Sequence, residues 1–374
     1  MSMNRRVWLR NSSMLAGATL LLGRESLAMP TVADGAGDSS APDAESRARL
    51  ASNENPYGPP KSARDAMMRA WDESNRYGPA GAPELRASLA AQWQVPADHI
   101  LITQGSAEGL CASAAAFCAG GEVISAQPTY DQLLSYAETL GAKIVRVPLD
   151  ANLSFDLPAI EKRVGPFTRM VFVVNPNNPT GTLVNADQLE GFTKRVSAKA
   201  PVFIDEAYHE YVEVPGHRSM MPLVTQGYDV VVSRTASKIH GMAGLRVGFL
   251  VARPDILARI AAYRQGFPNA MALRAAIAAV QDTEAQQFVR RQNAASRETI
   301  YRALDGLKRR YVPSHGNMVF FHTGRPISDV IQQFAERGID VGRPFPPMLD
   351  WCRVSTGTPA DTERFVGALR GIFA

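Results

Sequence analysis

Short runs typical of strands alternate with helical segments between residues 100 and 251, and this alternation constrains the fold more than any other feature of the chain. The expected strands are the largely apolar runs at residues 100–103, 122–126, 143–147, 170–174, 202–205, 229–233 and 248–251. Helices between successive strands favour parallel pairing, because each helix carries the chain back to the starting edge of the sheet. The pattern therefore predicts an α/β fold with a mostly parallel seven-stranded sheet.

A smaller α+β pattern follows the alternating region. A long helical stretch is expected at residues 269–310, and after it strands at 317–322 and 353–355 alternate with helices at 328–337 and 360–372. The composition changes at Gly266-Phe267-Pro268, which is usual at a domain boundary. We therefore expect a large domain at 80–267, a small domain at 268–374 and an arm at 49–79 that joins the small domain. A chain of 374 residues, 45% of them hydrophobic, can supply a core for both.

The first 28 residues resemble a twin-arginine (Tat) export signal. Arg5 and Arg6 precede an apolar run at residues 12–22, and Ser26-Leu27-Ala28 offers small residues for cleavage. The apolar run is too short to span a membrane, and residues 29–48 have the composition of a flexible linker. We expect a periplasmic or otherwise exported protein. The alternative is an unstructured start with chance arginines, on a cytoplasmic protein.

Outside this leader the chain is nearly neutral. Four arginines and one glutamate give the leader a charge of +3, which leaves +1 of the formal +4 for the other residues. Such a body gives no reason to expect a nucleic acid or a membrane surface as a partner. Cys111 and Cys118 lie about 10 Å apart on one expected helix, too far for a disulfide. The six histidines show no ligand spacing, so no metal site is expected.

One lysine lies among hydroxyl groups and glycines directly after the strand at 229–233. The stretch contains Thr235, Ser237 and Lys238, and the next basic residue is Arg246. A lysine amine in a pocket of small residues can form an imine with an aldehyde cofactor, while hydroxyls and a guanidinium suit a phosphate dianion. This combination points to pyridoxal phosphate. By itself, the stretch fits a glycine-rich surface loop with an exposed lysine equally well.

Four more polar clusters follow strand ends, where ligands bind in sheets of this kind. They are residues 103–108 with Ser106 at an expected helix start, 128–130 with Tyr130, 175–181 with Asn178, and 205–208 with Asp205 and Tyr208. Each has a plain structural alternative, in order a helix N-cap, a core tyrosine, a turn and a helix cap. The functional interpretation of Asp205 is that its carboxylate pairs with a buried cation.

Taken together and in this order, the five clusters resemble the pyridoxal-phosphate enzymes of fold type I, the class I/II aminotransferases, and most closely their histidinol-phosphate aminotransferase branch. The resemblance covers essentially everything after residue 49. It implies that Lys238 holds the cofactor and acts as the base, and that Asp205 keeps the pyridine nitrogen protonated. The other cofactor residues it implies are Tyr208 and Asn178 at the ring hydroxyl, Tyr130 on the ring face, and Ser106, Ala107, Thr235, Ser237 and Arg246 at the phosphate.

The resemblance also implies a homodimer that acts on small molecules, an amino acid and a 2-oxo acid. Tyr77 would reach the phosphate bound by the partner subunit, Arg353 would take the substrate carboxylate, and Asn53 would line the substrate mouth. Arg343 lies in a stretch of proline and phenylalanine and could meet a phosphate or a second carboxylate, or be a structural arginine. Clear features for histidinol phosphate are missing, so we expect an amino acid with an apolar or aromatic side chain.

Two other functions share these motifs. A decarboxylase of the same fold would keep every cofactor residue and release carbon dioxide instead of forming a 2-oxo acid. A cofactor-sensing regulator would keep the fold without turnover, but such regulators carry a DNA-binding helix-turn-helix in front, and the short leader is expected to leave no room for one. Aminotransferase activity is therefore the leading hypothesis.

Overall fold

The computed structural model describes residues 47–77 and 81–374. All of them belong to the compact unit from Pro42 to Ala374. The expected leader at residues 1–28 lies outside the described residues, so export stays a prediction. The expected linker at 29–48 overlaps them at its end, where Ala48 already belongs to strand β1.

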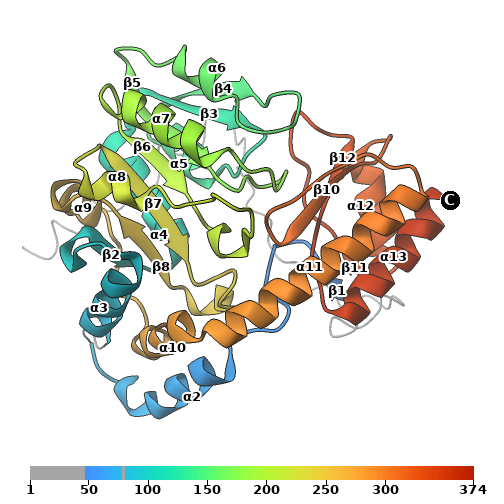
Figure 1. Cartoon of the computed structure of the whole chain (residues 1–374), viewed down its shortest axis with the longest axis horizontal. Helices are drawn as coiled ribbons and strands as arrows, with labels where there is room; N and C mark the ends of the chain where they lie inside the picture. Colours follow the sequence, from blue (N-terminus) through green and yellow to red (C-terminus); the bar gives the residue numbers. More distant parts are fainter. Residues whose placement is uncertain (1–46, 78–80) are drawn as a thin grey trace, which may run out of the picture. The chain divides into compact units, whose positions relative to one another are not determined.

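Seven strands form the large sheet, in the order β2-β8-β7-β6-β5-β3-β4 (Figure 1). Their bounds are β2 Ile100–Thr103, β3 Glu122–Gln127, β4 Lys143–Pro148, β5 Thr168–Val174, β6 Val202–Asp205, β7 Val230–Thr235 and β8 Gly248–Val251. Strand β8 runs antiparallel to both its neighbours, and the other four pairs are parallel. The predicted strands and the mostly parallel sheet are confirmed, with strand ends that differ by at most two residues.

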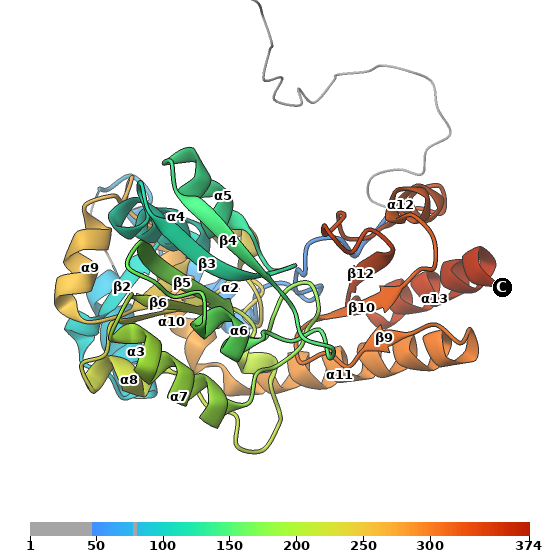
Figure 2. The same ribbon diagram turned by 90° about the horizontal axis from the view of Figure 1, so that it is seen from above.

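Helices cover both faces of the large sheet. Helices α4 (Gly105–Phe117) and α5 (Gln132–Thr139) lie on one face, and α7 (Ala186–Ser197) and α8 (Met221–Thr225) lie on the other (Figure 2). The remaining helices around this sheet are α2 Lys61–Arg69, α3 Ala82–Trp93, α6 Leu157–Glu161, α9 Pro254–Ala261 and α10 Ala270–Gln281, with short 3-10 turns η2 Trp71–Glu73, η3 Ala97–His99, η4 His209–Tyr211 and η5 Ala243–Leu245.

The central strands contain continuous apolar runs, as expected of strands with both faces covered. Val171, Phe172, Val173 and Phe203 are completely buried, and the rings of the two phenylalanines lie 5.7 Å apart. Each such side chain contributes about 1.5–3 kcal/mol when it leaves water. The sheet is therefore a rigid platform, and only the loops at its edges are available for binding.

A second, three-stranded sheet has its own hydrophobic core. It has the order β12-β10-β9, with β9 at Tyr311–Val312, β10 at Met318–His322 and β12 at Trp351–Ser355. Helices α11 (Thr283–Gly306), α12 (Ile327–Ala335) and α13 (Pro359–Phe373) pack around it. Strands β1 (Ala48–Arg49) and β11 (Ile339–Asp340) pair beside it and tie the start of the described chain to this part. The exact domain boundaries expected from the sequence stay a prediction.

The expectation of one helical stretch at 269–310 was wrong in one respect. Two helices, α10 and α11, meet at Asp282, whose backbone is not helical (φ −81°, ψ 78°). The side chain of Asp282 accepts a hydrogen bond from the backbone N–H of Ala285, which caps α11 and starts a new helix there. Helix α10 packs against α2 and joins the core of the large sheet, while α11 leads to the three-stranded sheet (Figure 1).

Membrane spans, metal ligands and cysteines can be checked in the described residues. Within residues 47–77 and 81–374, no helix is long and apolar enough to cross a membrane. The same residues contain no group of three or more histidine, cysteine or acidic side chains placed to hold a metal ion. Cys111, Cys118 and Cys352 are free thiols, as the helical spacing of the first two predicts.

Candidate active site

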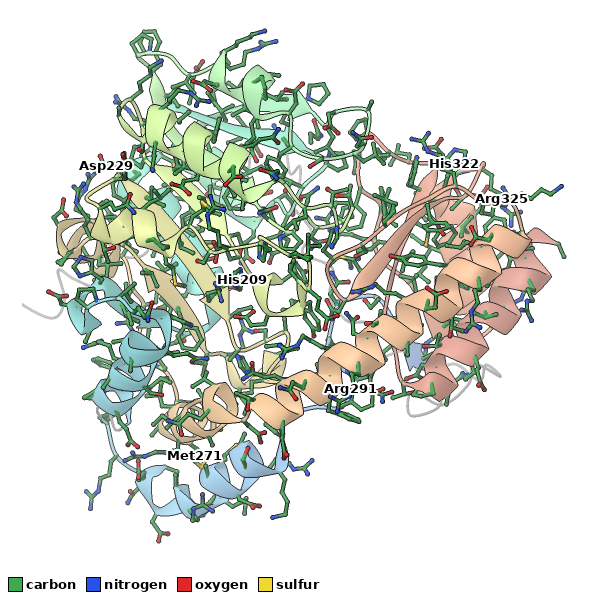
Figure 3. All side chains as sticks on the ribbon, viewed as in Figure 1. His209, Asp229, Met271, Arg291, His322 and Arg325 are labelled. Atoms are coloured by element: carbon green, nitrogen blue, oxygen red, sulfur yellow. The ribbon has the colours of Figure 1, made fainter. Side chains whose placement is uncertain are left out.

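A cavity of about 720 Å³ opens at the carboxyl edge of the large sheet, on the side of the three-stranded sheet. Figure 3 shows side chains from both parts in this region and labels His209, which follows Tyr208 along the chain, and Asp229, which precedes β7 at the opposite edge. Twelve of the fourteen residues expected to form the site line this cavity, namely Ser106, Ala107, Tyr130, Asn178, Asp205, Tyr208, Thr235, Ser237, Lys238, Arg246, Arg343 and Arg353. Residues separated by up to 247 positions are thus brought together: those of the large sheet because its parallel strands end at one edge, and Arg343 and Arg353 because the part with the three-stranded sheet packs against that edge.

Asp205 supplies a buried carboxylate at the base of the cavity. It ends β6 and is only 2% exposed. Its Oδ1 accepts hydrogen bonds from Ser233 Oγ at 2.6 Å and from the backbone N–H of Ala207 at 3.1 Å. Burial raises the pKa of Asp205 to about 6, although these hydrogen bonds and the charge of Lys238 oppose the rise. Within the described residues Asp205 forms no salt bridge, so a cationic ligand group would find a partner here.

Lys238 reaches the cavity from the turn that follows β7. Its Nζ donates hydrogen bonds to the backbone carbonyls of Asn53 at 3.0 Å and Ser52 at 3.2 Å, and it lies 5.7 Å from the ring centre of Tyr208. Burial lowers the pKa of Lys238 to about 8, and the positive charge of Arg353 adds to the effect. The amine is therefore easily deprotonated near neutral pH, which both a nucleophile and a base require.

Tyr208 and its neighbours form a buried hydrogen-bonded layer behind the lysine. Asn53 Nδ2 donates to the Tyr208 hydroxyl at 3.0 Å, and burial raises the pKa of Tyr208 to about 12. Asn178 Oδ1 accepts from Arg353 Nη1 at 2.8 Å, and a second Arg353 nitrogen donates to the carbonyl of Ala51. The network keeps Tyr208 protonated and orients two donors, the phenol and the guanidinium, toward the cavity.

Arg353 is a buried cation without a carboxylate partner in the part of the chain that the structure describes. It lies on β12 and is 6% exposed, and burial lowers its pKa to about 10. Its Nε has no hydrogen-bond partner among those residues. A buried, uncompensated guanidinium is unfavourable unless an anion binds beside it. The cavity therefore has the charge expected of a carboxylate site.

The opposite end of the cavity is shaped for a phosphate. Helix α4 begins at Gly105, so the backbone N–H groups of Ser106 and Ala107 lie in its first turn and can donate to an anion. A Cβ on Gly105 would lie 2.1 Å from Arg246 Nη2, and one on Gly248 would lie 2.3 Å from the backbone nitrogen of Ser106. Glycine at both positions lets Arg246 and strand β8 close around the helix start.

Successive side chains at the end of β7 point to opposite faces of the sheet, one toward the cavity and the other into a buried ion-pair cluster. Thr235 Oγ1 donates to Ser237 Oγ at 3.0 Å, and both hydroxyls line the cavity. Arg234 points to the opposite face, as successive strand residues do, and is buried between Glu206 and Glu210 with nitrogen–oxygen distances of 2.7 Å to each. The arginine inside the motif is therefore structural, while the hydroxyls beside it face the ligand.

Two of the fourteen expected residues lie elsewhere. Asn53 is buried behind the cavity wall, bonded to Tyr208 and Ser355, while its neighbours Ser52 and Glu54 line the cavity. The backbone of Asn53 has φ 51°, which turns its side chain inward and corrects the expectation that it lines the substrate mouth. Tyr77 is fully exposed to solvent and lies outside the cavity lining.

Three contributions were missed by the sequence reasoning. Ser233 bonds Asp205, and its place two residues before Thr235 on the same strand face was the available signal. Phe345 is buried between the guanidinium groups of Arg353 and Arg343. The carbonyls that hold Lys238 belong to a loop almost two hundred positions earlier, and no local pattern could have indicated them.

Known proteins match this chain in both sequence and fold. The profile of the family Aminotransferase class I and II matches residues 47–369. A histidinol-phosphate aminotransferase from Moorella thermoacetica is 36% identical over 330 residues, which are 87% of this chain and 85% of that protein. A crystal structure from Erwinia carotovora atroseptica, provisionally named histidinol-phosphate aminotransferase, is 35% identical with a TM-score of 0.84 and covers 89% of this chain and 98% of that one.

A more distant structure agrees in fold. The histidinol-phosphate aminotransferase of Sinorhizobium meliloti, solved in complex with pyridoxal-5'-phosphate, has a TM-score of 0.81 at 24% identity. The match covers 87% of this chain and 90% of that one. The fold class expected from the sequence, that of the type I pyridoxal-phosphate enzymes, is confirmed.

Proposed function

Because the chain belongs to the aminotransferase class I and II family, we propose that the cavity at the edge of its large sheet binds pyridoxal phosphate and is where the amino group is transferred. The protein is a pyridoxal-phosphate-dependent aminotransferase that acts on small molecules. The single observation that carries the site assignment is the buried Asp205 carboxylate in one cavity with the Lys238 amine.

The residues present fit this cofactor at both of its ends. Asp205 is a buried carboxylate without a cationic partner among the described residues, and a protonated ring nitrogen would compensate its charge. Gly105 and Gly248 leave a cradle between the start of α4 and Arg246 that a Cβ at either position would fill. Ser106, Ala107 and Arg246 would hold the phosphate there, and Thr235 and Ser237 are the hydroxyls next to it.

Each remaining residue has a role that follows from its chemistry. When bound, pyridoxal phosphate supplies an aldehyde that takes up amino groups and a ring that withdraws electrons. Lys238 would hold the cofactor and then, as a free amine with a lowered pKa, move a proton at the substrate Cα. Arg353 would bind the substrate carboxylate, with Asn178 and the carbonyl of Ala51 fixing the orientation of the guanidinium. Tyr208 stays protonated and can donate to an oxygen on the ring.

Chemical trapping tests the proposal directly. Purified protein loaded with pyridoxal phosphate should be yellow, and reduction with borohydride should fix the cofactor to the protein. Peptide mapping by mass spectrometry is expected to find it on the peptide that contains Lys238. Label on another lysine, such as the exposed Lys61, would reject Lys238 as the cofactor residue.

The active form is proposed to be a homodimer in which Tyr77 completes the partner subunit's site. In the described part of the chain, the side chain of Tyr77 is fully exposed and lies outside the cavity lining, as expected of a residue that serves the partner subunit. Trp71 and Met68, on the same stretch of chain, are also more than half exposed. Large apolar side chains grouped on one segment are typical of a surface that another molecule covers.

A mixed-subunit experiment checks this arrangement. Tyr77→Ala and Lys238→Ala should each be poorly active alone, whereas coexpression of the two should restore activity. Restoration is expected because a mixed dimer contains one site with Lys238 from one subunit and Tyr77 from the other. Activity is measured on heterodimers purified through two different tags. If Tyr77 serves its own subunit, no mixed site is intact and no activity returns.

A further inference from the structure

Two arginines reach the cavity from the side of the three-stranded sheet, and they differ in their partners. Arg353 on β12 has no carboxylate within salt-bridge distance in the described ranges 47–77 and 81–374. Arg343, in the segment after β11, donates through Nη2 to Asp131 Oδ1 at 2.7 Å. The charge of Arg353 is therefore available to a ligand, whereas that of Arg343 is already matched by a carboxylate of the protein itself.

The side chain of Asp131 forms this ion pair instead of capping its own helix, α5. It occupies the N-cap position of α5, where an aspartate normally accepts a backbone N–H of the first turn. Its side chain accepts no such bond, and Oδ1 instead contacts a guanidinium 212 positions later in the chain. Asp131 and Arg343 are each about half exposed; Arg343 lines the cavity, and Asp131 contacts it from outside the lining.

The wall around this pair is apolar. Phe345 is buried, and its ring centre lies 4.6 Å from the guanidinium carbon of Arg343 and 5.0 Å from that of Arg353. Val341 and Pro344 line the cavity beside it. Gln127, at the end of β3, donates to the carbonyl of Pro346 at 3.2 Å and fastens this segment a second time. Beyond the carboxylate site, a substrate thus meets a phenylalanine face and a neutralised arginine.

We propose that the Asp131–Arg343 ion pair makes the enzyme select amino acids with an uncharged, apolar or aromatic side chain, and that Asp131 determines this specificity. This inference rests on the proposed function. A side chain with a distal anion, whether carboxylate or phosphate, would meet Arg343 with its charge already matched and would be repelled by Asp131. An uncharged side chain avoids both effects and packs on Phe345, while Arg353 serves the carboxylate that all amino acids share.

Three amino donors test the proposal on the cofactor-loaded enzyme. They are L-phenylalanine, whose side chain is uncharged, L-glutamate, with a distal carboxylate, and O-phospho-L-serine, with a distal phosphate. The quantity compared is kcat/KM for each donor. The wild-type enzyme should favour phenylalanine over both distal anions. In Asp131→Asn, the ratio of kcat/KM for a distal anion to that for phenylalanine should rise about tenfold, since Arg343 is released and a repulsion is removed, each a partly exposed interaction.

Two further variants test whether a change in donor preference comes from the Asp131–Arg343 ion pair or from the loss of any carboxylate on α5. Adding Arg343→Gln to Asp131→Asn should remove the part of the gain that comes from the released cation and leave only the part that comes from the lost repulsion. Glu138→Gln is the matched control: Glu138 lies on the same helix, α5, and its carboxylate pairs with Arg146 at 3.0 Å with similar exposure, away from the cavity lining. Its donor ratios should equal those of the wild type.

The outcomes are distinct. The inference is overturned if the wild-type enzyme prefers glutamate or O-phosphoserine, or if Asp131→Asn leaves the donor ratios unchanged. Which of the two anionic donors gains in Asp131→Asn tells carboxylate from phosphate as the excluded group. If the yellow protein reacts with none of a full panel of donors, it is the proposed function that fails.

Discussion

Replacing Lys238 by alanine is expected to lower kcat/KM by at least about 10³-fold, since a positioned general acid or base alone contributes about 10²- to 10⁴-fold. The same amine would also hold the cofactor, so its loss removes two functions at once. The amine is half-buried and its pKa is lowered to about 8, so about a tenth of it is unprotonated at pH 7 and about half at pH 8. The measurement is steady-state amino transfer with saturating cofactor.

The control for this variant is Lys143→Ala. Lys143 is exposed, pairs with Glu122 at 2.8 Å and begins β4, at the edge of the sheet opposite the cavity. This variant should keep wild-type activity. Circular dichroism and thermal unfolding of Lys238→Ala should match the wild type, because only two hydrogen bonds to loop carbonyls are lost. Retention of activity within tenfold would show that another group carries the proton.

Replacing Asp205 by asparagine is expected to slow the half-reaction roughly 10²- to 10³-fold while the protein still binds cofactor. Breaking a buried ion pair costs about 3–5 kcal/mol, and part of this loss would be felt in the transition state. The asparagine oxygen can still accept from Ser233 and Ala207, so the local structure should be retained. Stopped-flow absorbance of the cofactor measures the rate, and Asp187→Asn, on the surface, is the control.

The raised pKa of Asp205 adds a dependence on pH. In the protein without cofactor, the pKa of Asp205 is about 6. The carboxylate is therefore mostly ionised at about pH 7.5 and mostly protonated well below pH 6. Affinity for a cofactor with a protonated ring nitrogen should therefore weaken as the pH falls through 6. Asp205→Asn should remove this dependence, and equilibrium titration followed by fluorescence measures it. An affinity of the wild type that stays constant from pH 8 to pH 5 would contradict the pairing.

The Asp205→Asn substitution should slow the reaction, but it should not lower the stability of the folded protein. Because the pKa of Asp205 is higher in the folded than in the unfolded state, the folded protein binds the proton more tightly. Above pH 6 the ionised carboxylate then lowers the free energy of unfolding. Without cofactor at neutral pH, Asp205→Asn should unfold at the same temperature as the wild type or at a higher one. A clearly lower temperature would indicate damage to the fold rather than to the site.

Local patterns in the sequence were sufficient for the elements and for most of the site. The strand at 202–205 is apolar until its final residue, which marks Asp205 as an acid at a strand end. Lys238 follows β7 by three residues, so any parallel arrangement of these strands brings it to the same edge. Ten of the twelve expected residues in the cavity belong to the large sheet and its loops, and the alternation predicts that parallel strands bring such residues to one edge.

Contacts between residues that lie far apart in the sequence could not be predicted from local patterns. The position of Asn53 depends on a left-handed backbone and on Ser355, three hundred residues later. The partner of Arg343 is Asp131, 212 positions away at the start of α5, and no local pattern links the two residues. The break between α10 and α11 depends on how Asp282 caps the second helix, although both segments have the composition of helices.

The amino-acid sequence by itself determined the class of fold, the type of cofactor and the acid and amine at the strand ends, because these follow from short-range periodicity and residue chemistry. Only the tertiary structure decided which cations in the cavity are available to a substrate. Arg353 and Arg343 look alike along the chain, and they differ because one is buried without an acid among the described residues while the other meets Asp131. The charge that a ligand experiences depends on distances between distant residues, and these exist only once the chain has folded.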